Sequence, residues 1–235
     1  MGQAVVEAGL DGVLSLAGRV ARPLRQPLPQ RVGGFGGIDG LRDWLRTERI
    51  THVIDATHPF AAQMSRNAVA ACAAERVPYL ALTRAPWVAQ AGDAWQHVPD
   101  IAGAVAALKG PPRRVMLAIG RQHLAAFAAQ PQHYYLLRLV DPPEAPLPLP
   151  RTHVIVDRGP FTEAADHALM RAQGIDLVIS KNSGGTGAQA KILAARALGL
   201  PVVMIDRPAL PARAEVHELA EAMAWLAHDG TPRGV

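Results

Sequence analysis

The sequence predicts an α/β fold with parallel sheets, arranged in two halves. Short apolar runs typical of buried strands alternate with longer helix-forming runs along the chain. This alternation implies right-handed crossovers and parallel strand pairing. Most strand-like runs end in Gly, Arg, Asp, His or Lys, and ligands of such sheets lie outside the carboxyl ends of the strands. We therefore expect one elongated, mostly basic cleft.

Residues 1–86 form the first half of this alternation. Helices are expected at residues 3–8, 40–48 and 61–75, and strands at residues 13–17, 52–56 and 77–82. The glycine-rich run 33–37 is expected to end a further strand. Pro86 breaks regular structure, so the boundary between the halves is placed after it.

Residues 87–235 repeat the alternation. Strands are expected at residues 95–98, 115–119, 134–139, 153–156, 177–179 and 202–205, and helices at residues 188–198 and 215–227. The Pro-rich stretch 141–150 is expected to be an extended surface loop. Strands of the same type continue beyond it, which argues against a linker between independent domains there.

The first strand of a complete dinucleotide-binding domain is missing from the sequence. Such a domain opens with a strand, a Gly-rich phosphate turn and a helix. This chain opens inside what is expected to be that helix, and the second strand, at residues 13–17, follows directly. A parallel sheet without its central strand leaves backbone groups unpaired. We therefore expect the natural protein to start upstream of Met1.

Composition excludes several classes of function. The chain carries 24 Lys and Arg against 20 Asp and Glu, with the Arg residues dispersed and few aromatic residues. Because no helix-turn-helix or stacking motif is present, nucleic acid is not an expected partner. The apolar runs are too short to cross a membrane, and no secretion signal opens the chain. A single cysteine, Cys72, suits a reducing cytoplasm.

The turn at residues 180–187 is a candidate ligand site. It follows the apolar run 177–179 and precedes a helix, so its free backbone N–H groups favour anions, and Lys181 adds a positive charge. Its glycines, among them Gly184 and Gly185, would let the backbone approach a ligand closely. The Walker phosphate-loop order is absent. A Gly-rich connection without a ligand is the alternative.

Several motifs together extend over nearly the whole chain. They are Leu14-Ser-Leu-Ala-Gly-Arg19, Val32-Gly-Gly-Phe-Gly-Gly37, Asp55-Ala-Thr-His-Pro-Phe-Ala61 with Ser65 and Asn67, Ala118-Ile-Gly-Arg121, and Ser180-Lys-Asn-Ser-Gly-Gly-Thr-Gly187. With these motifs the chain resembles the precorrin-6A reductase family of cobalamin biosynthesis. Members of that family usually open with a strand and a Gly-Gly-Thr-type turn, which this chain lacks.

The resemblance implies two Rossmann-like domains with the active site in the cleft between them. Residues 1–86 would bind the cofactor, and residues 87–235 would contribute substrate and cofactor contacts. The implied reaction is NADPH-dependent reduction of precorrin-6A, a tetrapyrrole with multiple carboxylates, to precorrin-6B, and transient contact with neighbouring pathway enzymes is compatible with it. The alternatives are the cobalt-bound substrate of the anaerobic route and a non-catalytic two-domain binding protein.

The expected cofactor is NADPH. In dinucleotide folds the position just after the second strand reads the adenosine ribose, and Arg there accommodates a 2′-phosphate. Arg19 occupies this position, close to Ser15, and a plain surface Arg is the alternative. The expected cofactor-binding residues are Ser15, Gly18, Arg19, Gly34, Phe35, Gly36 and Thr57.

His58 and Lys181 are the expected catalytic residues. An imidazole titrates near neutrality, so His58 could donate a proton. Orienting a ligand together with Thr57, while solvent supplies the proton, is the alternative. The expected substrate-binding residues are His58, Arg121, Lys181, Asn182, Ser183, Gly184, Gly185 and Thr186. No Cys/His cluster has the spacing of a metal site, so no metal is expected.

Overall fold

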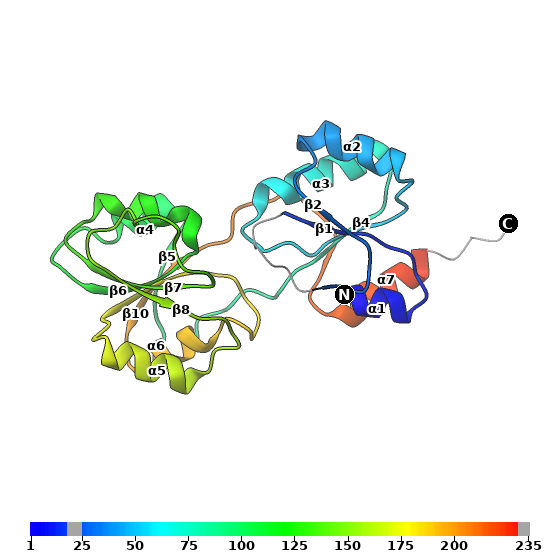
Figure 1. Cartoon of the computed structure of the whole chain (residues 1–235). Helices are drawn as coiled ribbons and strands as arrows, with labels where there is room; N and C mark the ends of the chain where they lie inside the picture. Colours follow the sequence, from blue (N-terminus) through cyan, green and yellow to red (C-terminus); the bar gives the residue numbers. More distant parts are fainter. Residues whose placement is uncertain (18–24, 230–235) are drawn as a thin grey trace. The chain divides into compact units, whose positions relative to one another are not determined.

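A computed structural model describes residues 1–17 and 25–229 of the chain (Figure 1). Two compact units are present. Unit 1 comprises Met1–Thr83 together with the segment from Ala209 onward, and unit 2 is Arg84–Pro208. The predicted division assigned residues 87–235 to one domain. In the structure the chain instead returns to unit 1 after Pro208.

Unit 1 contains short parallel strands with helices on both faces. Its strands are β1 (Leu14–Leu16), β2 (Gln30–Val32), β3 (Val53–Asp55), β4 (Tyr79–Leu82) and β11 (Glu215–Val216). Its helices are α1 (Gly2–Glu7), α2 (Gly37–Thr47), α3 (Ala62–Glu75) and α7 (Leu219–Asp229). In Figure 1, α2 and α3 lie on one face of the strands, and α1 and α7 lie on the other.

The core of unit 1 lies between α2 and α3. Leu41 and Leu45 are one helical turn apart on α2 and face the small residues Ala68, Ala71 and Cys72 of α3. Residues spaced by three or four positions share one face of a helix, so these two stripes bury each other. Helix α2 begins at Gly37, the last residue of the glycine-rich run 33–37. Because α2 packs against α3, the position of the run that precedes it is fixed as well.

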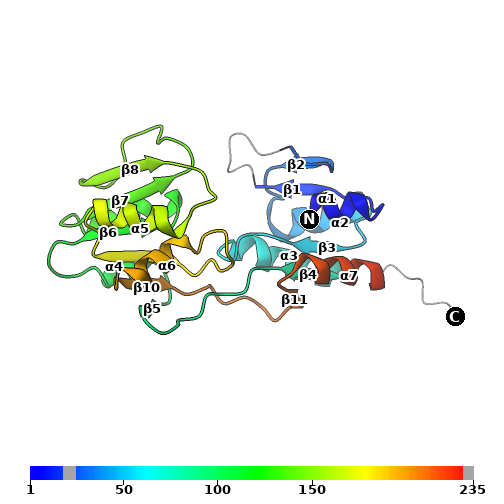
Figure 2. The same ribbon diagram turned by 90° about the horizontal axis from the view of Figure 1, so that it is seen from below.

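The strands of unit 1 form two separate sheets. Strand β1 pairs with β2, and β3 pairs with β4, which pairs with β11; all of these pairings are parallel. Figure 2 shows β1 on the side of β2 that faces β3. Among the described residues no ladder joins β1 to β3. Within the described residues the sheet of unit 1 is therefore interrupted between β1 and β3.

The predicted helix at residues 215–227 is wrong at its start. Glu215 and Val216 form strand β11, which pairs with Ala81 and Leu82 of β4, and α7 begins only at Leu219. The N–H of Thr83 donates to the carbonyl of Val216 at 2.9 Å. Pairing of β4 with a distant segment satisfies backbone groups that would otherwise lie on an open sheet edge, and this outweighs helix propensity.

Unit 2 is a single six-stranded parallel sheet with strand order β5-β10-β9-β6-β7-β8. Its strands are β5 (Ala94–Val98), β6 (Arg114–Ala118), β7 (Tyr134–Leu139), β8 (Thr152–Val156), β9 (Leu177–Lys181) and β10 (Pro201–Ile205). Its helices are α4 (Ile101–Ala106), the 3₁₀ helix η1 (Arg121–Ala129), α5 (Glu163–Ala172) and α6 (Ala190–Ala197). Helix α4 covers one face of the sheet, and α5 and α6 cover the other (Figure 1). The predicted α/β class with parallel sheets is confirmed.

The order of strands in unit 2 defines where a ligand would lie. After β6 the chain crosses to β7, the neighbour of β6 on one side. After β9, the neighbour of β6 on the other side, the chain crosses to β10, which lies still farther in that direction. Ligands of open α/β sheets bind at such a point, outside the carboxyl ends of the two strands. The turn that follows β9 and the residues that follow β6 therefore occupy the expected position. None of the helices in the described part of the chain is long and apolar enough to cross a membrane.

Candidate active site

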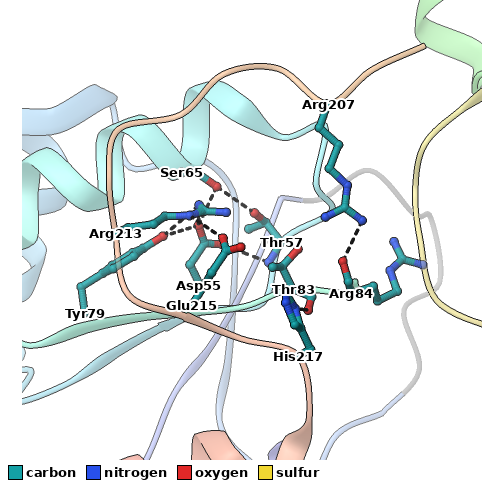
Figure 3. Close-up of polar contacts among 10 residues, drawn as sticks. All are labelled: Asp55, Thr57, Ser65, Tyr79, Thr83, Arg84, Arg207, Arg213, Glu215 and His217. Atoms are coloured by element: carbon teal, nitrogen blue, oxygen red, sulfur yellow. Dashed lines mark hydrogen bonds and ion pairs between the residues drawn. The ribbon is translucent and has the colours of Figure 1, made fainter. Parts of the chain in front are cut away.

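A buried carboxylate organises the end of β3 in unit 1. Asp55 is only 7% exposed, and its oxygens accept hydrogen bonds from Ser65 Oγ at 2.6 Å, Tyr79 Oη at 2.8 Å and the backbone N–H of Thr57 at 3.0 Å (Figure 3). Arg213 lies 3.7 Å from the same carboxylate. Four segments of unit 1 therefore meet at one anion.

The charge on Asp55 is stabilised by these donors. Burial by itself would raise the pKa of this carboxyl, but hydrogen bonds from Ser65, Thr57 and Tyr79 outweigh burial and lower its pKa below 3.8. Burial, followed by the adjacent charge of Asp55, raises the pKa of Tyr79, which therefore stays a protonated donor. Arg213 also donates to Tyr79 Oη at 3.3 Å. The cluster is therefore an ionised carboxylate held by neutral donors and by Arg213.

The turn after β3 presents Thr57 and His58. Thr57 Oγ1 lies 3.3 Å from Ser65 Oγ, so the Asp55 cluster fixes its side chain. His58 is exposed, and its Nδ1 accepts a hydrogen bond from the backbone N–H of Phe60 at 3.2 Å. In the neutral ring the proton is therefore on Nε2. A second proton would enter at Nδ1 and displace the Phe60 N–H, so proton exchange by His58 is coupled to this hydrogen bond.

A second group of polar contacts joins β1 to β2. Arg31 Nη1 donates to Ser15 Oγ at 2.8 Å and to the carbonyl of Gly33 at 3.0 Å, and Nη2 donates to the carbonyl of Gly34 at 3.0 Å. The guanidinium also lies 3.8 Å from the ring centroid of Phe35. Sequence reasoning missed Arg31. Its position just before the Gly-rich turn was the signal that could have identified it.

The turn after β9 packs closely against the segment that enters unit 2. Asn182 is only 6% exposed, and its amide donates to the carbonyl of Trp87 at 2.9 Å and accepts from the Trp87 N–H at 2.8 Å. Trp87 Nε1 donates to the carbonyl of Gly185 at 2.8 Å. The described contacts of Asn182 are therefore structural, although the residue was expected to bind substrate.

The glycines of this turn are required by the chain itself. Gly184 has φ of 68° and Gly185 has φ of 69°, a region that favours glycine. A Cβ atom on Gly184 would overlap the carbonyl oxygen of Ala85, and one on Gly185 would lie 2.6 Å from the Arg84 side chain. The close approach of residues 84 and 85 therefore accounts for both glycines, and their predicted contact with a ligand stays a prediction.

Arg207 fastens the same turn from beyond β10. Its Nη2 donates to the carbonyl of Arg84 at 2.7 Å (Figure 3). The same Nη2 donates to the carbonyl of Ser183 at 3.2 Å, and Nε donates to the carbonyl of Asn182 at 3.0 Å. A guanidinium presents several donors in a rigid plane, so one side chain can hold two segments. The turn that bears Lys181 is therefore preorganised within unit 2.

The structure separates the predicted site residues by unit. Unit 1 holds Ser15, Gly34, Phe35, Gly36, Thr57 and His58 at the carboxyl ends of β1, β2 and β3. Unit 2 holds Arg121, Lys181, Asn182, Ser183, Gly184, Gly185 and Thr186 after β6 and β9. Gly18 and Arg19 lie outside the described residues. Within residues 1–17 and 25–229 no group of three or more His, Cys, Asp or Glu is arranged to hold a metal ion.

Comparison with known proteins identifies the family. The sequence profile of a family described as precorrin-6x reductase CbiJ/CobK matches residues 1–227. The chain belongs to this family. It is 59% identical, over 100% of its length and 94% of the relative's, to a Rhodobacter capsulatus protein named precorrin-6A reductase. A solved structure of CobK precorrin-6A reductase matches with a TM-score of 0.93 and 60% identity, covering 100% of this chain and 94% of the other.

Precorrin-6x reductases of another kind are less similar to this chain. A Priestia megaterium protein named cobalt-precorrin-6A reductase is 31% identical over 72% of this chain and 70% of its own length. The family resemblance inferred from the motifs is thus confirmed. The structural match, which covers the whole chain, also confirms the α/β fold class.

Proposed function

We propose that this protein catalyses NADPH-dependent reduction of precorrin-6A to precorrin-6B in cobalamin biosynthesis. The observation that carries the proposal is the 59% identity over the whole chain with a protein named precorrin-6A reductase. A cobalt-free substrate is favoured because the relative named for the cobalt-bound form is 31% identical and matches 72% of the chain.

The chemistry at the ends of β1 and β2 supports NADPH as cofactor. Arg31 is permanently charged and adjoins the Ser15 hydroxyl and the Gly33–Gly34 backbone, so this corner of unit 1 suits an adenosine ribose that bears a phosphate. Phe35 adds an aromatic surface beside the guanidinium. When bound, NADPH supplies the hydride. Binding and orientation remain the task of the residues of this chain.

Proton supply is assigned to His58. In the neutral ring Nδ1 accepts from the Phe60 N–H and Nε2 carries the proton; the charged ring carries protons on both nitrogens and gives up that hydrogen bond, which re-forms when Nδ1 releases its proton. Thr57 is fixed through Ser65 and Asp55 and would position a ligand beside His58. Reduction of a conjugated macrocycle by hydride requires one proton for each hydride, and an exposed imidazole can relay it from solvent.

The turn after β9 is proposed to recognise substrate carboxylates. Lys181 supplies charge, Ser183 and Thr186 supply hydroxyl groups, and Arg121 lies at the start of η1, after the neighbouring strand β6. Charge-assisted bonds of this kind are about twice as strong as neutral ones. Asn182 is assigned a positioning role instead, because both ends of its amide bond to Trp87.

The test is direct assay of the purified protein with precorrin-6A and NADPH. Consumption of NADPH, followed by its near-ultraviolet absorbance, should accompany a change in the pigment spectrum. NADH and cobalt-precorrin-6A serve as competing cofactor and substrate. Faster turnover of the cobalt form would reverse the substrate assignment. Binding of the pigment without turnover would instead support a non-catalytic binding protein.

Replacement of Lys181 tests the substrate-binding turn. Lys181→Ala should raise KM for precorrin-6A by about tenfold or more, the effect of losing one charge-assisted contact. Thermal stability should stay unchanged, since the side chain ends a strand and contributes little to the core. Lys109→Ala removes an equal charge from an exposed position of the same unit and is the control. Wild-type kcat/KM in Lys181→Ala would show that the turn is only a connection.

A further inference from the structure

A cavity of about 170 Å³ lies at the carboxyl end of β6 in unit 2. Its walls include Met116 and Leu117 of β6, Arg138 of β7, and Lys191 of α6. This is the point where β6 and β9 continue toward opposite sides of the sheet, which is where open α/β sheets bind ligands. None of the residues assigned above to substrate or cofactor lines it.

The cavity holds an excess of positive charge. Arg138 forms an ion pair with Asp166, which is only 1% exposed, so one cation is neutralised. Lys191 is a second cation, and Arg84 is close enough to repel it. Of the acidic groups in the described residues, Asp166 is the one that raises the pKa of Lys191. An additional anion in the cavity would therefore be electrostatically favourable.

The polar atoms around the cavity suit two acceptor oxygens. Arg138 Nε is buried and has no hydrogen-bond partner among the described residues, although the guanidinium stacks 4.0 Å from the Phe161 ring centroid. Lys191 Nζ donates to the carbonyl of Ala188 at 2.6 Å, which leaves it two further protons. Helix α6 begins at Ala190, beside the cavity, and a helix start also favours an anion.

Lys191 is held in an unusual environment. The residue is half-buried, and its ammonium group lies 4.9 Å from the ring centroid of Trp87. Burial, partly opposed by Asp166 and aided by the charges of Arg138 and Arg84, lowers the pKa of this lysine to about 8. An anion bound beside Lys191 would raise this pKa and hold the ammonium in its charged form.

We propose that this cavity binds one carboxylate-bearing side arm of the substrate, with Arg138 and Lys191 as its donors. The inference rests on the proposed function for the identity of the ligand. Sites for whole small molecules measure about 300–1,000 Å³, so a cavity of about 170 Å³ accepts an arm and not a macrocycle. The apolar walls at Met116, Leu117 and Phe161 suit the methylene groups of an acetate or propionate arm better than an inorganic phosphate.

Propionate is the probe that tests the site without the reaction. Titration of the ¹⁵N-labelled full chain should give saturable shifts at the Trp87 indole N–H and at the Ala190 and Lys191 amides. Lys191→Met, which keeps side-chain length but removes the charge, should weaken propionate binding at least about tenfold. Lys109→Met should bind as wild type does. Equal affinity in Lys191→Met, or no saturable binding to wild type, would overturn the proposal.

Two further measurements distinguish the alternatives. Inorganic phosphate in place of propionate should bind more weakly, and saturation by phosphate alone would overturn the carboxylate assignment. Wild-type affinity for propionate should fall several-fold between about pH 7 and about pH 9, as Lys191 loses its proton. The pH titration uses only the wild-type protein, so it tests the role of Lys191 even if Lys191→Met does not fold. A constant affinity for propionate over that pH range would contradict the proposed site.

Kinetics connect the site to the substrate. With precorrin-6A, Lys191→Met should raise KM about tenfold while KM for NADPH stays at the wild-type value, because Lys191 belongs to unit 2 and the proposed cofactor-binding residues belong to unit 1. If the protein turned over no precorrin-6A, the proposed function would fail while the propionate titration would still decide the cavity.

Discussion

At the scale of single residues, a few side chains organise the ends of the strands. Arg31 joins Ser15 to the Gly33–Gly34 backbone, and Asp55 collects donors from α3, β4 and the turn after β3. Each contact involves a charged group with several partners, and such hydrogen bonds contribute about 1.5–3 kcal/mol. Substitution of either residue should therefore have a measurable and specific effect.

Arg31→Met should reduce the preference for NADPH over NADH. The substitution removes a permanent charge and the donors that hold Ser15 and the Gly33–Gly34 turn, so kcat/KM for NADPH should fall by about tenfold to a hundredfold. Steady-state kinetics with both cofactors measure the ratio. Arg49→Met removes an exposed charge from the same unit and is the control. An unchanged ratio in Arg31→Met would refute the assignment of this corner to the cofactor phosphate.

Asp55 makes unit 1 sensitive to acid. Its folded-state pKa is lowered, so the unfolded chain takes up the proton first as pH falls. The stabilisation is complete above the unfolded value near pH 3.9 and is lost as pH falls through the folded value. Denaturant unfolding of Asp55→Asn should show a lower free energy of unfolding at neutral pH, by about 2–4 kcal/mol, and a flatter decline below pH 4. An equally steep acid decline in the variant would contradict this prediction.

At the scale of elements, the turn after β9 is held by the rest of unit 2. Trp87, Asn182 and Arg207 join three segments that are far apart in the sequence, and Gly184 lies where any side chain would collide with Ala85. Backbone hydrogen bonds and steric fit together make the turn rigid. Preorganised donors lose little freedom on binding, which favours recognition of a charged ligand.

Gly184→Ala tests how much of the turn depends on this packing. The added Cβ overlaps the Ala85 carbonyl at a φ of 68°, so the variant should lose about 1–3 kcal/mol of unfolding free energy and most of its activity. Gly187→Ala is a matched control, since no atom lies within 4 Å of the Cβ position there. Chemical unfolding and kcat/KM distinguish the two. Equal behaviour of the two variants would show that the turn tolerates displacement.

At the scale of the whole molecule, the two units differ in completeness. Unit 2 has one continuous sheet, whereas the strands of unit 1 form two sheets with no ladder between β1 and β3 among the described residues. Unpaired backbone groups at the facing edges are unfavourable unless another strand or water satisfies them. Unit 1 should therefore be the less stable of the two.

An added strand should repair unit 1. A variant extended before Met1 by an apolar strand and a Gly-Gly-Thr turn should gain about 2–4 kcal/mol of unfolding free energy, because each new ladder hydrogen bond contributes about 1 kcal/mol. It should also bind NADPH more tightly, since the turn adds free N–H groups for phosphate. Guanidinium unfolding and calorimetric titration measure both. The control carries the same extension with prolines within the strand; equal gains in the control would show that the break accepts no strand.

The alternation of strands and helices could be predicted from the sequence by itself. Buried parallel strands are short apolar runs, and residues 134–139 and 177–179 could be located because they contain four and three consecutive apolar or aromatic residues. Because the apolar runs locate the strands, the polar and glycine residues that end them, such as Asp55 and Lys181, could also be predicted from the sequence. An interruption of the first sheet was also predicted, because the expected elements of residues 1–86 begin with a helix.

Only the tertiary structure decided the roles that depend on distant partners. Three such contacts join segments many residues apart. Residues 215–216 pair with β4, Arg31 binds Ser15, and Asn182 holds Trp87. Local propensity contains no information on such contacts, and at residues 215–216 it favoured a helix. The cavity at Arg138 and Lys191 has the same origin, because strand order, and not sequence order, brings β6, β7 and α6 together.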